Sequence, residues 1–326
     1  STHTKEFPLW MSTNPEVDDW KELVHKHQAG AWDPQLFWDK EKDELYMYYG
    51  SSNLYPLYGL KLNRKTFQPE GEPVPVLALN DDEHGWERFG ENNDNTFLQP
   101  FTEGAFMTKH NGKYYLQYGA PGTEFSGYAD GVAVGDGPLN YFQNQSDPLS
   151  MKAGGFARGA GHGATFQDNQ KKYWHVSTMV VAVKNNFERR LGIWPAGFDK
   201  DDVMYCNTAF GDYPHFAPAL PDKQGAFTGW MLLSYKKPVI ASSTVDTFSA
   251  KHVTDENVKS FWLAQENNEK QWLKIDLEKE AKVQIALAKL NLYNAVDKAN
   301  AFGKEAILYF SEGDEQRVML MGLKRF

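Results

Sequence analysis

Cysteine is almost absent from this sequence. The 326 residues include a single cysteine, Cys206, so no internal disulfide can form and a disulfide-stapled fold is excluded. Long hydrophobic runs are also missing, because the longest apolar stretch, near residues 179–183, stops at Lys184. A membrane-spanning helix needs about 18 or more consecutive apolar residues, so the sequence predicts no transmembrane segment.

Positive charge is scarce as well. The chain has 34 Lys and Arg residues against 43 Asp and Glu residues, a formal net charge of −9. Proteins that bind the phosphate backbone show a basic patch, so we expect no nucleic-acid partner. The glycine-rich stretch 154–163 has no P-loop lysine, and no nucleophile elbow occurs, which excludes a phosphate cradle and a serine-hydrolase site of that type.

Helical periodicity is rare before residue 240, whereas aromatic residues make up 14% of the chain. Aromatic side chains favour β-strands, and exposed aromatic rings can pack against the apolar faces of sugars. We therefore predict an all-β protein.

Three stretches of the chain repeat one pattern: a short strand, a polar hairpin turn and a second, aromatic-rich strand. They cover residues 33–50, 103–119 and 162–177, and a weaker copy covers 215–235. Spacings of roughly 50–70 residues fit a four-stranded propeller blade with its loops. The spacing favours a β-propeller over a β-sandwich, whose turns come at shorter intervals.

Each repeat opens with a polar residue. These residues are Asp33, Glu103 and His162, with His215 in the weaker copy. The innermost strands of a propeller converge on its central axis, so equivalent positions on them approach one another. The repeat predicts an acidic, histidine-bearing funnel.

The residues at these openings resemble a known family. The segments 33–34, 102–104, 161–163 and 189–195 are together similar to glycoside hydrolase family 43, whose fold is a five-bladed β-propeller. The resemblance implies that residues 1–237 form such a propeller, with an incomplete first blade.

Composition changes near residue 238. The tail, residues 238–326, resembles a discoidin (coagulation-factor C-type) domain, a jelly-roll β-sandwich, through segments 241–243, 255–257, 261–262 and 271–277. The alternation from Trp272 to Leu277 predicts a strand with one buried face.

The family resemblance implies hydrolysis of a glycosidic bond with inversion, typically of terminal α-L-arabinofuranose or β-D-xylose. By its motif, Glu103 matches the general acid, and Asp33 matches the carboxylate that tunes and orients the acid. A general base is expected one blade earlier, but no aspartate matches there: Asp18 and Asp19 precede Trp20 in what reads as an outer strand. The acid must keep its proton near neutral pH, which burial and a neighbouring carboxylate both favour.

Five further residues are candidates for substrate or metal binding. His162 lies between two glycines and is either a core histidine or, as in the family, a residue beside a bound cation or water cluster on the axis. Calcium is the candidate cation, with oxygen groups or water completing its ligands. Only one of Arg189 and Arg190 can face the funnel, because adjacent strand residues point in opposite directions. Trp32 and Phe101 are candidate sugar platforms.

We therefore predict a secreted or periplasmic, exo-acting α-L-arabinofuranosidase that acts on the side chains of plant polysaccharides. An exo-galactanase or β-xylosidase of the same fold is an alternative. The missing base leaves a second class open, a non-catalytic carbohydrate-binding propeller. A structural protein that interacts through its tail is a third possibility.

Overall fold

The computed structural model describes residues 7–29, 32–145, 147–152, 158–180, 189–206, 208, 233–255, 260–265, 271–280, 306–312 and 315–321. In this part of the chain the helices are three short 3-10 turns: η1 (Pro15–Val17), η2 (Gly85–Glu87) and η3 (Ala250–Val253). Among the same residues, none of the helices has the length and apolar character needed to cross a bilayer. The all-β prediction is confirmed for the described residues.

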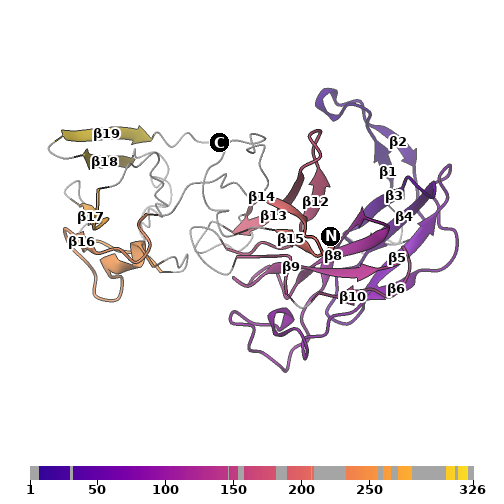
Figure 1. Cartoon of the computed structure of the whole chain (residues 1–326), viewed down its shortest axis with the longest axis horizontal. Helices are drawn as coiled ribbons and strands as arrows, with labels where there is room; N and C mark the ends of the chain where they lie inside the picture. The colour runs from indigo at the N-terminus through magenta and orange to yellow at the C-terminus, as the bar shows by residue number, and fades with distance from the viewer. Residues whose placement is uncertain are drawn as a thin grey trace.

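Three antiparallel meanders of four strands form the bulk of the molecule (Figure 1). The first sheet is β3 (Gln35–Asp39), β4 (Glu44–Tyr49), β5 (Leu57–Leu62) and β6 (Val74–Leu77). The second is β7 (Glu103–His110), β8 (Lys113–Ala120), β9 (Ala129–Gly135) and β10 (Gln143–Asn144), with β11 (Ser150–Met151) also paired to β9. The third is β12 (Ala164–Gln167), β13 (Tyr173–Val180), β14 (Arg189–Phe198) and β15 (Met204–Cys206).

The sequence repeats match the first two strands of each sheet. Strand β3 pairs with β4, β7 with β8, and β12 with β13, each across a polar turn. Strand β7 also contacts both β3 and β12, so the three first strands lie next to one another. Most of the weaker fourth copy, residues 215–235, lies outside the described residues.

The described sheets have the arrangement of three consecutive propeller blades, but they do not close into a ring. Closure by five blades therefore stays a prediction. Ahead of the first sheet, β1 (Leu9–Met11) and β2 (Lys21–Val24) form a two-stranded ribbon. The sequence predicts an incomplete first blade at this position, and the described residues there form only this two-stranded ribbon.

Aromatic side chains fill the seam between the first and second sheets. Buried members of this cluster are Tyr46, Tyr48, Leu57, Val76, Leu77, Ala105, Met107, Tyr114, Leu116, Tyr118, Ala120, Ala133 and Phe142. Each buried aromatic ring removes roughly 150–250 Å² from water. The abundance of tyrosine in the repeats is thus explained mainly by packing of one sheet against the next.

A buried charge also joins these two sheets. The carboxylate of Asp39, at the end of β3, accepts hydrogen bonds from Lys109 Nζ at 2.9 and 3.0 Å and from the Tyr114 hydroxyl at 2.5 Å. Burial raises the pKa of Asp39, but the hydrogen bonds from Tyr114 and Lys109 outweigh burial and lower that pKa overall. Lys109 also reaches the exposed Glu41 at 2.8 Å.

The tail contains two separate strand pairs. Strand β16 (Val239–Ala241) pairs with β17 (Leu273–Ile275), and β18 (Ala306–Glu312) pairs with β19 (Glu315–Met321). The prediction of a buried face on β17 is wrong: Trp272 just before it is 51% exposed, and Leu273 and Ile275 are exposed as well. Within the described residues β17 pairs only with β16, and its apolar side chains are exposed to solvent. The discoidin-like sandwich and the boundary at residue 238 stay predictions.

Lys109 allows a matched comparison of a buried and an exposed partner. Asp39→Asn should lower the free energy of unfolding by roughly 1–3 kcal/mol at neutral pH, because hydrogen bonds to a buried charge are lost. Glu41→Gln, at a side chain that is 77% exposed, should change it by less than about 1 kcal/mol. Urea denaturation of both variants measures the difference.

The pH dependence of the Asp39 effect has a defined sign. Because the folded-state pKa of Asp39 is lowered, its stabilisation is present above the unfolded value of about 3.9 and is lost as the pH falls through the folded value. The gap between wild type and Asp39→Asn should therefore close below about pH 4. Equal losses in the Asp39 and Glu41 variants at neutral pH would contradict the assignment.

Candidate active site

The first strands of the three sheets are entered through a bent backbone. Asp33, two residues before β3, has φ 49°, and His162, two residues before β12, has φ 57°. Gly104 in β7 has φ 64° and lies in a bulge that follows Glu103. Left-handed conformations are uncommon outside glycine, although Asp and His adopt them more readily than most residues. The three bends all lie within two residues of the start of a first strand.

These bends bring three polar side chains together. One potential ligand atom from each of Asp33, Glu103 and His162 lies within 4.8 Å of the other two, and all three residues are half-buried. The three repeat openings, about 60–70 residues apart in the chain, therefore form one cluster. The chemical roles assigned to these residues from the sequence stay predictions.

Glu103 is held by two hydroxyl groups. Tyr128 donates a hydrogen bond to Glu103 Oε1 at 2.6 Å, and Ser51 donates to Oε2 at 3.2 Å. Burial and then the negative charge of Glu103 raise the pKa of Tyr128 well above its ordinary value, against a smaller lowering effect of Arg189. Tyr128 therefore stays protonated and acts as a fixed donor to the carboxylate.

Sequence reasoning missed Tyr128 and Ser51. Both lie in loops, and neither belongs to a local pattern that points to Glu103. The sequence contains only an indirect signal for Tyr128: glycines at the repeats leave space for the Tyr128 ring. A Cβ atom on Gly161 would lie 2.6 Å from the Tyr128 ring, and one on Gly119 would lie 2.8 Å from the Tyr128 hydroxyl.

The electrostatic environment of Asp33 is unusual. Burial raises the pKa of Asp33, and the negative charge of Glu103 raises it further. The nearby His162 and a hydrogen bond from the backbone of Gly104 lower it, but the net direction is upward. The ring of His162 packs directly on Gly104, where an added Cβ would lie 2.8 Å from the imidazole. The site thus holds a carboxyl group that releases its proton less readily than a solvent-exposed one.

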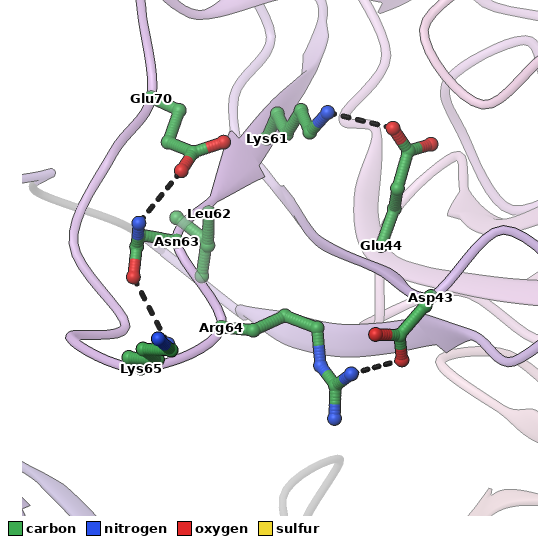
Figure 2. Close-up of a pocket in the computed structure, with 8 residues that line it drawn as sticks. All are labelled: Asp43, Glu44, Lys61, Leu62, Asn63, Arg64, Lys65 and Glu70. Carbon is green, nitrogen blue, oxygen red and sulfur yellow. Dashed lines mark hydrogen bonds and ion pairs between the residues drawn. The ribbon is translucent and has the colours of Figure 1, made fainter.

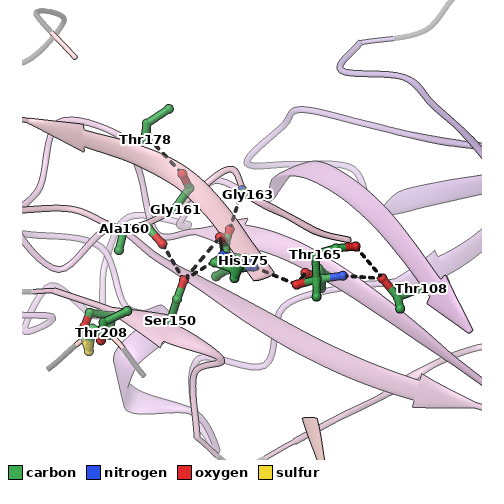
Figure 3. Close-up of polar contacts among 12 residues, drawn as sticks. Thr108, Ser150, Ala160, Gly161, Gly163, Thr165, His175, Thr178 and Thr208 are labelled. Carbon is green, nitrogen blue, oxygen red and sulfur yellow. Dashed lines mark hydrogen bonds and ion pairs between the residues drawn. The ribbon is translucent and has the colours of Figure 1, made fainter. Parts of the chain in front are cut away.

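A buried polar network fixes the loop that carries His162 (Figure 3). Asp130 Oδ1 accepts a hydrogen bond from the backbone of Gly163 at 3.2 Å, and Asp130 Oδ2 lies 2.9 Å from His175 Nε2. On the other side, Thr178 donates to the carbonyl oxygen of Gly161 at 3.0 Å. The residues before and after His162 are therefore both anchored.

The same network contains a serine, a histidine and an aspartate, but it does not form a nucleophilic triad. Ser150 Oγ and Asp130 Oδ2 both contact Nε2 of His175, at 3.2 and 2.9 Å. In a triad the serine and the aspartate use opposite ring nitrogens, whereas here Nδ1 contacts Thr165 at 2.9 Å. Ser150, His175 and Asp130 are also buried. The network therefore has a structural role in holding the loop that carries His162.

The remaining sequence candidates occupy different positions. The two arginines point to opposite faces of β14: Arg189 is partly buried and its charge acts on Tyr128, whereas the exposed Arg190 donates to the carbonyl oxygen of Arg189. Trp32, next to Asp33, is half-buried, and its carbonyl oxygen accepts from Gly50 at 2.9 Å. Phe101 is 37% exposed. Arg189 is thus the arginine on the side of the cluster.

The cluster meets only part of the needs of calcium. Calcium takes six to eight oxygen ligands, and Asp33 and Glu103 contribute carboxylate oxygens, while His162 contributes a nitrogen. Both oxygens of Glu103 already accept hydrogen bonds. Water would have to supply most of the ligands, so calcium stays a prediction and no chemical step below depends on it.

A charged cleft of about 540 Å³ lies elsewhere, at the opposite end of the first sheet (Figure 2). Its charges pair with one another: Lys61 contacts Glu44 at 2.6 Å, and Arg64 contacts Asp43. The cleft lies beside the turn between β3 and β4, whereas Asp33 lies at the start of β3. It is separate from the Asp33–Glu103–His162 cluster.

Asp33 provides a test of the electrostatics. A raised folded-state pKa means that ionised Asp33 costs stability, because the stability present below its unfolded pKa is lost as the pH rises through the folded value. Asp33→Asn should therefore unfold at the same temperature as the wild type or a higher one at pH 7, with the gain vanishing below about pH 4.

Asp18→Asn is the matched control, because Asp18 is exposed and has a similar φ of 53°. It should leave thermal unfolding unchanged at every pH. A clear loss of stability in Asp33→Asn at pH 7 would show that ionised Asp33 does not strain the fold.

Comparison with known proteins gives the family. The sequence model of glycosyl hydrolases family 43 matches residues 2–204. A second match, to the acyl-CoA dehydrogenase C-terminal domain, covers residues 267–325, and no match supports the discoidin resemblance. No match was found among curated proteins.

Solved structures of the family share the fold. A xylan β-1,4-xylosidase from Bacillus halodurans is 18% identical with a TM-score of 0.52, and the match covers 68% of this chain and 42% of that one. A thermostable family-43 glycoside hydrolase is 20% identical with a TM-score of 0.50, covering 69% of this chain and 70% of that one. A family-43 protein from Bacillus licheniformis is 18% identical with a TM-score of 0.51, and the match covers 71% of this chain and 41% of that one. The chain thus spans less than half the length of two of these three proteins.

The family match extends over more than half of the sequence and includes the first two sheets, strands β12 to β14 of the third, and the cluster at their first strands. The chain belongs to glycosyl hydrolases family 43.

Proposed function

We propose that the protein is an exo-acting, inverting glycosidase that removes terminal α-L-arabinofuranosyl residues from the side chains of plant polysaccharides. The observation that carries the proposal is the meeting of Asp33, Glu103 and His162 within 4.8 Å at the start of three neighbouring first strands. A carboxyl pair of this kind, in a family of glycosidases, supports acid-catalysed cleavage of a glycosidic bond.

Glu103 is the proposed general acid. As the bond between the anomeric carbon and the leaving oxygen breaks, Glu103 gives its proton to that oxygen. The hydroxyl groups of Tyr128 and Ser51 then hold the resulting carboxylate in place, at 2.6 and 3.2 Å. The same two contacts fix the orientation of the Glu103 side chain.

Asp33 is the proposed tuning carboxylate. The acid and base of an inverting glycosidase lie about 6.5–9.5 Å apart, which leaves space for a water molecule between base and sugar. Asp33 and Glu103 approach within 4.8 Å, so Asp33 is too close to serve as that base. The proposal therefore requires a base outside the cluster. His162, Arg189, Trp32 and Phe101 are the proposed substrate contacts.

The same cluster supports related substrates. An exo-galactanase or a β-xylosidase would use the same acid with a different sugar pocket. Assays on 4-nitrophenyl α-L-arabinofuranoside, β-D-xylopyranoside and β-D-galactopyranoside separate these activities, and NMR of the first product gives its anomer. Turnover of none of these substrates by the purified protein would contradict the proposed activity.

A non-catalytic carbohydrate-binding protein is the second candidate. It is favoured by one observation: the sequence has no aspartate that matches the base position one blade before Asp33. This candidate predicts binding of arabinan, xylan or galactan in calorimetry without release of sugar.

We propose that the protein is secreted or periplasmic, because polysaccharide side chains are too large to reach an enzyme inside the cell. A discoidin-like tail that packs on the propeller or binds sugar is part of the same proposal. If the full chain binds sugar and the binding persists after residues 238–326 are removed, the tail has no role in binding.

Glu103→Gln tests the acid. The substitution keeps the size of the side chain but removes its transferable proton, so kcat/KM on arabino-oligosaccharides should fall by about 10²–10⁴-fold. The exposed Glu41→Gln, at the other end of the first two sheets, is the control and should keep wild-type activity. Activity retained in Glu103→Gln, with circular dichroism unchanged, would remove Glu103 from the mechanism.

His162→Gln tests the electrostatic coupling. The charge of His162 lowers the pKa of Asp33, so its removal should raise that pKa further. Asp33 tunes the acid only in its ionised form, so the acidic limb of the pH profile of kcat/KM should move to higher pH with the pKa of Asp33. His110→Gln, at the far end of β7, should leave the limb in place. A limb that stays fixed or moves to lower pH in His162→Gln would contradict the coupling.

A further inference from the structure

Two loops at the Glu103 end of the sheets expose apolar side chains. The first, residues 51–56, leads from the end of β4 to β5, and the second, residues 95–101, leads into the start of β7. Strand β4 ends and β7 starts where β3 begins, because β4 runs antiparallel to β3 and Ser52 in the first loop bridges to Thr102. Both loops are thus on the face that holds the Asp33–Glu103–His162 cluster.

The first loop is held by its own serine. Ser52 Oγ accepts hydrogen bonds from the backbone of Leu54 at 2.9 Å and of Tyr55 at 3.1 Å. Leu54 and Tyr55 are nevertheless strongly exposed, Tyr55 to 65%. A turn fixed in this way presents the two side chains to solvent.

The second loop repeats the device. Asn95 Oδ1 accepts from the backbone of Phe97 and of Leu98, both at 3.0 Å. Phe97 is 93% exposed, and Leu98 is exposed as well. Two neighbouring loops therefore each present a leucine and an aromatic ring on a turn that a polar side chain fixes.

These loops connect directly to the catalytic cluster. Ser52 and Thr102 exchange two backbone hydrogen bonds of 3.1 and 3.0 Å, and Thr102 precedes Glu103. Ser51, next to Ser52, donates to the Glu103 carboxylate at 3.2 Å. Any chain that leaves the cluster past Glu103 on this side meets the two loops.

The chemistry of the loops favours a neutral partner. Neither residues 51–56 nor residues 95–101 include a charged residue. Exposed apolar patches beside a catalytic site mark binding surfaces, and aromatic rings pack well on the apolar face of a sugar while its hydroxyl groups remain in water. A neutral polysaccharide fits this surface, whereas an acidic one would find no cation on it.

We propose that Leu54, Tyr55, Phe97 and Leu98 form the binding surface for the leaving-group side of a neutral polysaccharide chain. This inference rests on the proposed function, because Glu103 as acid marks the side on which the leaving oxygen departs. The surface holds the chain beyond the scissile bond, so it acts on polymeric substrates and leaves the reacting sugar untouched.

The experiment compares Tyr55→Ala, Phe97→Ala and the double variant with the wild type and with Trp38→Ala. Trp38 is an exposed aromatic residue near the opposite end of β3, so it is the matched control. Binding is measured by affinity electrophoresis in gels that contain arabinan, xylan or galactan. Activity is measured as kcat/KM on arabinan and on 4-nitrophenyl α-L-arabinofuranoside.

The double variant should bind the retained polysaccharide at least about tenfold more weakly than the wild type, with a similar loss in kcat/KM on the polymer. Its kcat/KM on the aryl glycoside should stay within about twofold, because that substrate lacks a chain to contact the loops. Trp38→Ala should match the wild type in both assays.

Three results would overturn the proposal: unchanged polysaccharide binding in the double variant, equal losses on the polymer and the aryl glycoside, or a wild type that binds none of the three polysaccharides. Binding that depends on the loops in a protein without hydrolytic activity would keep the loops as a polysaccharide-binding surface, but it would reject the proposed function and with it the assignment to the leaving-group side. The two failures are therefore distinguishable.

Discussion

The buried carboxylate of Asp130 is the interaction on which the site depends. A buried carboxyl group is tolerated only when its oxygens are hydrogen-bonded, and the oxygens of Asp130 contact residues of the third sheet: the backbone of Gly163 and the ring of His175. Asp130 itself belongs to β9 of the second sheet. This contact therefore joins the second and third sheets and fixes the loop that presents His162. Because the contact anchors the loop of His162, it also holds His162 in place beside Glu103.

Backbone conformation complements this anchor. Asp33, Gly104 and His162 all occupy the left-handed region, which costs energy for residues with a side chain. At His162 the ring packs against Gly104, and the backbone keeps its left-handed conformation there. Local strain and the raised pKa of Asp33 coincide at one place. The backbone is thus strained at the residues that are expected to take part in the chemistry. Packing in the tyrosine-rich seam stabilises the sheets around these residues.

The sequence was informative where the pattern is local and uninformative where contacts cross between sheets. Strand, turn and aromatic strand repeat within about 20 residues, so the three sheets and the meeting of Asp33, Glu103 and His162 follow from spacing. Tyr128 and Ser51 reach Glu103 from separate loops, and no periodicity marks such contacts. Alternation also misled at Trp272, because a period of two shows that a strand has two faces but does not show that a second layer covers one. The choice between Arg189 and Arg190 needed the face of β14 that lies toward Tyr128.

The distance along the chain between the clustered residues has a kinetic consequence. Asp33, Glu103 and His162 belong to three sheets whose strands pair mostly with their immediate neighbours in sequence, so each sheet can form from local contacts. The cluster itself needs the docking of sheets across long loops, and such non-local contacts are slow to form and carry a high entropic cost. During refolding, strand content should therefore recover first, and the Asp33–Glu103–His162 cluster should form last, when the sheets dock.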